Sequence, residues 1–132
     1  MKDIKATESK ILDSSVWIAY LFDSQFKNHI DKDNRLFLSI LSLFEIKAVL
    51  LKRKLEEEKI NEKINFIKKK STILSINETI AEKAAELSIE KNLPAIDSLI
   101  YATSSTNKIK LITLDNNFKG LENADVLSHK EN

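Results

Sequence analysis

Several residue types on which protein sites are commonly built are absent from this sequence or nearly so. It has no cysteine, which excludes disulfides, thiolate nucleophiles and cysteine-ligated zinc sites. Only two histidines are present, His29 and His129, which leaves little material for a histidine zinc site or a Ser-His-Asp triad. Gly120 is the only glycine, which excludes the glycine-rich loops that bind nucleotide phosphates. Any catalytic site must therefore be built from carboxylates, hydroxyls, amides and amines.

The sequence also lacks long apolar runs and an excess of one charge. No apolar run approaches the roughly 18 residues of a membrane helix, and no apolar stretch follows the charged N-terminus, so we expect a cytoplasmic protein. The 21 basic and 20 acidic residues do not indicate a basic nucleic-acid surface, and the basic runs at 52–54 and 68–70 are typical of helix ends. A chain of 132 residues fits one domain, over 1–132, with flexible tails expected at 1–9 and 129–132.

Five short apolar segments alternate with longer segments of helical periodicity. The expected strands are 11–12, 36–40, 72–76, 110–114 and 124–127. The segments between them carry apolar residues three and four positions apart, as at Ile60, Ile64 and Ile67, and Asn77 is an expected helix cap. This alternation predicts an α/β fold, a three-layer α/β/α sandwich around a small, mostly parallel sheet of four or five strands.

Four acids occupy positions where burial is expected. Asp13 and Asp115 each directly follow an expected strand, and open parallel sheets bind ligands at the carboxyl ends of their strands. Glu45 and Asp97 lie among apolar residues in early helical turns, although an acid there, as at Asp97, also suits the helix dipole. Four converging carboxylates would repel one another unless a divalent cation neutralised them. The pattern therefore predicts an oxygen-ligated Mg²⁺ or Mn²⁺ and metal-assisted hydrolysis.

The segments around these acids resemble the motifs of PIN-domain nucleases. The matching segments, in the family's order, are ILDSSVWIA at 11–19, LFEI at 43–46, LPAIDSLIYA at 93–102 and LITLDNNF at 111–118. Each motif alone is weak, but the four in order cover most of the chain, from about residue 11 to residue 127. The subgroup that the chain most resembles is the toxin-type PIN proteins called VapC, which are compact ribonucleases held inactive by an antitoxin.

The resemblance implies a Mg²⁺- or Mn²⁺-dependent endoribonuclease that acts on RNA, usually as a homodimer, and has an antitoxin partner. Asp13, Glu45, Asp97 and Asp115 would form the family's acidic tetrad. We expect the three aspartates to hold the metal directly or through water, because Mg²⁺ takes few protein ligands. Glu45 would complete the ligand set or orient the attacking water. No organic cofactor is expected.

Three further polar residues would support the carboxylates. Ser15 and Thr113 are expected to hold a carboxylate by hydrogen bonds, although helix capping explains such hydroxyls equally well. Asn117 stands where many relatives carry an acid, which leaves open whether the site takes one cation or two. The aromatic residues Trp17 and Phe118 could stack on an RNA base, but core positions are the favoured interpretation.

Other interpretations compete with the toxin. A stand-alone PIN nuclease of RNA processing would have the same motifs, whereas a catalytically silent PIN-like binding module would not need the intact tetrad. A von Willebrand A-type adhesion site is disfavoured because it needs Ser at the position of Trp17. An aspartate-dependent phosphotransferase is disfavoured because it needs Asp at the position of Ser15. The helices around Phe44 and Phe66 carry more apolar residues than one sheet face needs, which predicts a surface for a second copy or a partner's helix.

Overall fold

The computed structural model describes residues 8–32 and 35–129. Its elements are β1 (Ser9–Leu12), α1 (Ser14–Asp23), α2 (Lys27–Ile30), β2 (Arg35–Ser39), α3 (Ile40–Lys52), α4 (Glu57–Lys70), β3 (Ser71–Leu74), α5 (Glu78–Glu90), α6 (Ala95–Asn107), β4 (Lys110–Thr113), the 3₁₀ turn η1 (Asn116–Phe118) and β5 (Ala124–Val126). Ser9, expected in the N-terminal tail, instead belongs to β1 because it pairs with Arg35. His129, expected in the C-terminal tail, accepts a 2.9 Å hydrogen bond at its backbone carbonyl from the Gln25 side chain. Of the two expected tails, residues 1–7 and 130–132 lie outside the described residues.

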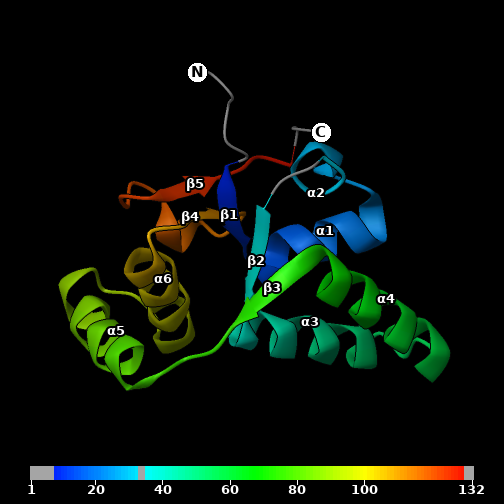
Figure 1. Cartoon of the computed structure of the whole chain (residues 1–132), viewed down its shortest axis with the longest axis horizontal. Helices are drawn as coiled ribbons and strands as arrows, with labels where there is room; N and C mark the ends of the chain where they lie inside the picture. The colour runs from blue at the N-terminus through cyan, green and yellow to red at the C-terminus, as the bar shows by residue number, and fades with distance from the viewer. Residues whose placement is uncertain (1–7, 33–34, 130–132) are drawn as a thin grey trace.

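The sheet has the strand order β3-β2-β1-β4-β5, and every neighbouring pair is parallel. Helices α5 and α6 cover one face and α1, α3 and α4 cover the other (Figure 1). This architecture confirms the predicted three-layer sandwich, with five strands that are all parallel. The chain builds outward from β1 to β2 and β3, and then returns to place β4 on the other side of β1. The direction of winding therefore reverses between β1 and β4, where sheets of this kind bind ligands.

Successive residues of the strands face opposite helical layers. Ile11 belongs to the apolar core under α5 and α6, whereas Leu12 belongs to the core under α1, α3 and α4. Leu111 and Ile112 on β4 divide in the same way. Strands that are buried on both faces need apolar residues at every position, which explains why the strands appear in the sequence as continuous apolar runs.

Side-chain caps set several helix boundaries. Asn77 caps α5 as predicted, since its side-chain oxygen accepts a 2.9 Å hydrogen bond from the backbone N–H of Ile80. Ile40, expected to end the second strand, instead begins α3, because the Ser39 hydroxyl accepts a hydrogen bond from the Leu41 N–H at 3.1 Å. Helix α2 was not predicted, because its four residues are too few to show helical periodicity.

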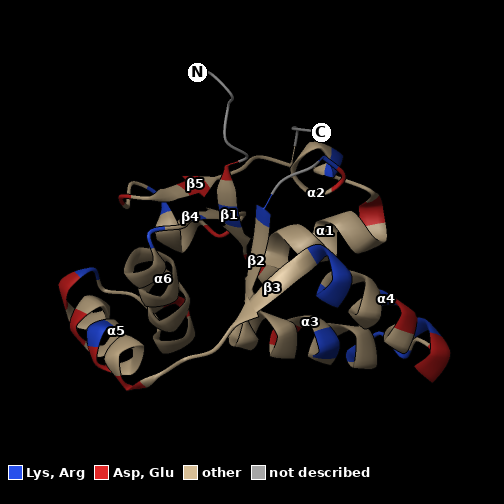
Figure 2. Cartoon of the chain, in the orientation of Figure 1, with Lys and Arg blue, Asp and Glu red and all other residues tan. Residues whose placement is uncertain are grey.

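Charges at the ends of α4 complement the helix dipole. Glu57 and Glu58 lie in its first turn and Lys68, Lys69 and Lys70 in its last, as Figure 2 shows by colour. The interpretation of the basic run 68–70 as a helix end is therefore confirmed. In the part of the chain that the structure describes, no helix combines the length and apolar character needed to cross a membrane.

Candidate active site

Asp13 is a buried acid at the end of β1, with only 6% of its surface exposed. Its Oδ1 atom accepts a 2.9 Å hydrogen bond from the backbone N–H of Ser14, which makes Asp13 the N-cap of α1. Its Oδ2 atom accepts hydrogen bonds from Thr113 Oγ1 at 2.7 Å and from Ser15 Oγ at 3.3 Å. Both hydroxyls that the sequence suggested as carboxylate supports therefore contact the same acid.

The surroundings of Asp13 disfavour its charge. Burial raises the pKa of this carboxyl from 3.8 to about 6, although the hydrogen bonds from Thr113 and Ser14 lower the pKa in part and the charge of Glu45 raises it. At neutral pH Asp13 is therefore ionised in a place where a negative charge is costly. A cation held beside it would offset this cost.

Glu45, on α3, is the partner of Asp13 in a first carboxylate pair. The Ser14 hydroxyl donates a 3.0 Å hydrogen bond to Glu45 Oε1, while the Ser14 N–H bonds Asp13. One residue thus orients both acids of the pair. This role of Ser14 was not predicted, because the sequence shows a hydroxyl beside Asp13 but not that it faces α3.

Asp97 and Asp115 form a second pair. Asp97 lies in the first turn of α6, and its Oδ2 atom accepts a 2.9 Å hydrogen bond from the Asn117 side-chain amide. Asp115 caps η1, since its Oδ1 atom accepts a 2.9 Å hydrogen bond from the backbone N–H of Asn117. Burial raises the pKa of Asp97, the Asn117 amide lowers it, and the neighbouring charge of Asp115 raises it further.

Thr113 joins the two pairs. Its Oγ1 atom donates to Asp13 and accepts a 3.0 Å hydrogen bond from the backbone N–H of Asp115. All four acids consequently belong to one hydrogen-bonded network at the carboxyl ends of β1 and β4. The network runs through Glu45, Ser14, Asp13, Thr113, Asp115, Asn117 and Asp97.

The network presents its acids as pairs. Within residues 8–32 and 35–129, no three carboxylate, imidazole or thiolate groups are arranged to hold a metal ion together. The groups present are oxygen donors, which suit the hard cations Mg²⁺ and Mn²⁺. Mg²⁺ keeps several of its waters and is bound in proteins through one or two carboxylates, so a pair of acids is a sufficient protein contribution. The donor set therefore fits such a cation.

Two aromatic residues near the acids in sequence are not available to a ligand. Trp17 and Phe118 are both fully buried, which confirms their interpretation as core residues. The Trp17 ring meets the rings of Tyr20 and Phe66 edge-on, at centroid distances of 6.1 and 6.4 Å. They contribute to the site by anchoring α1 and η1, the elements that follow Asp13 and Asp115.

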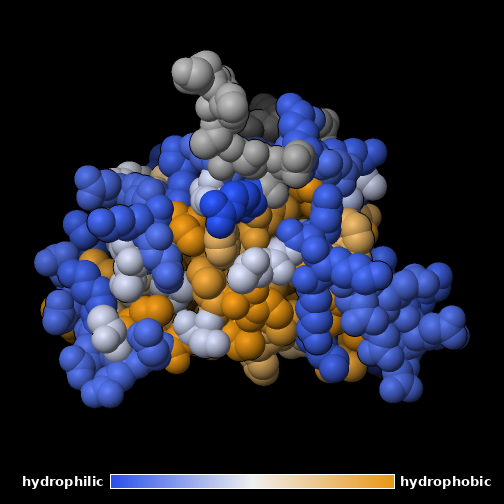
Figure 3. Space-filling view, viewed as in Figure 1, coloured by the Kyte–Doolittle hydropathy of each residue, from blue (hydrophilic) through white to orange (hydrophobic). Residues whose placement is uncertain are grey.

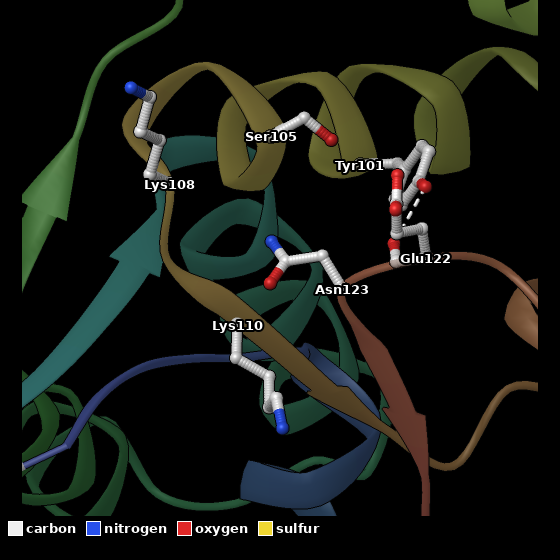
Figure 4. A pocket seen from close by; sticks show the side chains of 6 residues that line it. All are labelled: Tyr101, Ser105, Lys108, Lys110, Glu122 and Asn123. Atoms are coloured by element: carbon white, nitrogen blue, oxygen red, sulfur yellow. Dashed lines mark hydrogen bonds between the residues drawn. The ribbon is translucent and has the colours of Figure 1, made fainter.

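A hollow of about 490 Å³ lies away from the acids, at the amino ends of β4 and β5 (Figure 4). Tyr101, Lys110 and Asn123, which line it, make polar contacts within the fold. The Tyr101 hydroxyl donates a 2.7 Å hydrogen bond to the Glu122 carbonyl, and Lys110 Nζ lies 3.6 Å from Asp125 Oδ2. These contacts hold α6, β4 and β5 together at the amino ends of the strands, whereas the acidic network lies at the carboxyl ends.

Solved structures of similar fold include toxins of toxin–antitoxin systems. The toxin–antitoxin complex from Klebsiella pneumoniae gives a TM-score of 0.76 at 20% identity, covering 93% of this chain and 99% of that one. VapBC2 from Rickettsia felis, bound to a promoter DNA fragment, gives a TM-score of 0.75 at 18% identity, covering 90% of this chain and 97% of that one. Mycobacterium tuberculosis VapC20, described as a sarcin-ricin loop cleaving toxin, gives a TM-score of 0.64 at 14% identity, covering 86% of this chain and 95% of that one. At these identities the likeness shows a shared fold.

The family assignment rests on the sequence as well as on the fold. No curated protein is significantly similar to the chain in sequence. The family model of the PIN domain, however, matches residues 10–123, which include all four acids, most of β1 and all of β4. The chain therefore belongs to the PIN-domain family.

Proposed function

We propose that this protein is a Mg²⁺- or Mn²⁺-dependent endoribonuclease and the toxin of a toxin–antitoxin pair. The observation that carries the proposal is the hydrogen-bonded network of four carboxylates at the point where the sheet reverses its winding. Membership of the PIN-domain family supports it. The sarcin-ricin loop cleaving toxin from M. tuberculosis, which has the same fold, supports RNA as the substrate.

Each acid of the network has a distinct part in the proposal. We assign Asp13, Asp97 and Asp115 to the divalent cation, directly or through water. When bound, such a cation lowers the pKa of its water and stabilises negative charge on the phosphoryl oxygen. We assign Glu45, held beside Asp13 by Ser14, to completing the ligand set or orienting the attacking water.

The supporting hydroxyls act on Asp13. Ser15 and Thr113 donate to the same carboxylate oxygen, and Ser15 Oγ also accepts a 3.0 Å hydrogen bond from the Leu114 N–H. This arrangement ties α1 to β4 and limits rotation of the Asp13 side chain. We propose that the two hydroxyls fix the direction in which Asp13 faces the cation, as partners of metal ligands commonly do.

The proposal predicts that cleavage requires a divalent cation. The purified chain, incubated with a fluorescently labelled single-stranded RNA, is expected to cleave it in Mg²⁺ or Mn²⁺. Excess EDTA should abolish cleavage, because carboxylates alone supply neither an activated water nor a positive charge. Restoring an excess of Mn²⁺ should restore activity. Cleavage that persists unchanged in EDTA would contradict the proposal.

An apolar surface on α3 supports the proposal of a protein partner. Ile40, Phe44 and Leu51 are 41%, 71% and 57% exposed, and they line a groove of about 380 Å³ together with Lys47 and Ala48. Figure 3 shows apolar side chains gathered between α5–α6 and α4, over β3 and the beginning of α3. Large exposed apolar surfaces usually mark interaction sites. We assign this α3 surface to a homodimer.

Phe44 offers a direct test of the homodimer. Replacing it with serine removes the most exposed apolar ring of the α3 surface, so the Phe44→Ser variant is expected to be monomeric where the wild type is dimeric. The matched control is Ile89→Ser on α5, because Ile89 is 84% exposed and lies outside the α3 surface. Light scattering at micromolar concentration measures the mass of each protein. A monomeric wild type would refute the assignment.

We also propose an antitoxin partner. The similar structures from K. pneumoniae and R. felis are described as toxin–antitoxin and VapBC assemblies, which supports this part of the proposal. A small neighbouring gene that encodes a DNA-binding N-terminus and an amphipathic tail would be the candidate. Its product, co-expressed with this chain, is expected to copurify with it and to suppress RNA cleavage.

A further inference from the structure

Asn117 contacts both acids of the second pair, and it contacts each of them with a donor. Its side-chain nitrogen donates to Asp97 Oδ2 and its backbone nitrogen donates to Asp115 Oδ1, both at 2.9 Å. An ionised carboxylate only accepts hydrogen bonds, so the amide must present its nitrogen to Asp97. Asn117 is held in this position by η1, whose last residue, Phe118, is fully buried.

The two carboxylate pairs differ in their need for positive charge. Asp13 is buried, so its negative charge is poorly hydrated, and the donors that contact it from within residues 8–32 and 35–129 are all neutral. Asp97 and Asp115 are half-exposed, and water therefore screens part of their repulsion. The partial positive charges of the Asn117 N–H groups lie against both of these acids. A cation that bound Asp97 through Oδ2 would have to share this oxygen with the Asn117 amide.

We propose that Asn117 is a positioning residue that supports the pair Asp97 and Asp115 in place of a second cation, so that each chain binds a single divalent cation, the one assigned above to Asp13, Asp97 and Asp115. This inference rests on the proposed function, because it concerns the cation that the nuclease would use. The amide holds Asp97 toward Asp115 without adding charge. An acid at position 117 would remove the side-chain donor and put a third carboxylate beside the pair, which would create a second cation site.

The number of bound Mn²⁺ ions per chain tests the proposal without measuring activity. Electron paramagnetic resonance of free Mn²⁺ during a titration gives this number for the full chain. We expect one ion for the wild type and two for Asn117→Asp. The matched control is Asn116→Asp, which adds the same charge at the neighbouring exposed residue of η1 and is expected to keep one ion.

Each other outcome overturns a definite part of the argument. Two ions in the wild type would overturn the role of Asn117 while leaving the metal-dependent nuclease intact, and this measurement needs no variant to fold. One ion in a folded Asn117→Asp variant, checked by circular dichroism, would also overturn it. A second ion in Asn116→Asp would show that added charge alone suffices, against a specific role of Asn117. Absence of Mn²⁺ binding in the wild type would contradict the proposed function itself.

Discussion

Replacing Asp13 with asparagine is expected to lower the rate of RNA cleavage by at least about 100-fold, the upper end of the loss seen when a partner of a metal-bound group is removed. Asparagine keeps the shape of the side chain, and its oxygen can still accept the hydrogen bond from the Ser14 N–H. It removes the charge that faces the cation. Asp97→Asn is expected to have an effect of the same kind, because Asp97 belongs to the second pair of the network.

The measurement is kcat/KM on a labelled RNA at saturating Mn²⁺. The matched control is Asp23→Asn, since Asp23 is an exposed acid at the end of α1, outside the network. This control should retain wild-type activity. Full activity in both Asp13→Asn and Asp97→Asn would exclude the network as the catalytic site, whereas a loss in all three variants would point to a general effect of charge.

The same Asp13→Asn variant is expected to be more stable than the wild type when no metal is present. Burial and the Glu45 charge raise the pKa of Asp13 from 3.8 to about 6 in the folded state, so folding favours the protonated acid. The stabilisation from that proton is present below about pH 4 and is lost as the pH rises through about 6. The pKa shift lowers the free energy of unfolding at pH 7.5 by roughly 3 kcal/mol at most. A neutral asparagine does not carry this penalty, so the variant should be more stable by up to that amount.

Urea unfolding in EDTA measures this difference. The free energy of unfolding of Asp13→Asn is expected to exceed that of the wild type by about 1–3 kcal/mol at pH 7.5, and the gap should close near pH 4. The Thr113 and Ser15 hydroxyls can rotate to accept from the asparagine amide, but their own protons then lose Asp13 Oδ2 as an acceptor, which offsets part of the gain. Saturating Mn²⁺ should reverse the order, because it stabilises only a protein that binds it. A variant that is less stable at both pH values would contradict the electrostatic explanation.

The sequence predicted those parts of the fold that depend on local patterns. The strands could be predicted because residues buried on both faces of a parallel sheet form continuous apolar runs. The positions of Asp13 and Asp115 at the sheet edge followed from the strands that they end. Asn77 was predictable as a cap because its amide oxygen bonds a nearby backbone N–H. The end of β2 was not, because Ser39 acts as the cap of α3 and so turns Ile40 into a helical residue.

The arrangement of the acids as two linked pairs could not be predicted from the sequence. Helical periodicity indicates which face of α3 carries Glu45, but not how far that face lies from the end of β1. The roles of Ser14 and Asn117 depend on the direction of a hydroxyl and of an amide across helix–sheet contacts. Such contacts join residues 31 and 20 positions apart in the chain, beyond the reach of local patterns.

The central claim is that the carboxylates at the ends of β1 and β4 hold a divalent cation. Anomalous scattering from Mn²⁺ in crystals of the full chain tests it most directly, because it locates the ion without reference to activity. We expect a single strong peak per chain, in contact with at least one of Asp13, Glu45, Asp97 and Asp115. A saturated crystal whose only peaks lie away from all four carboxylates would contradict the claim.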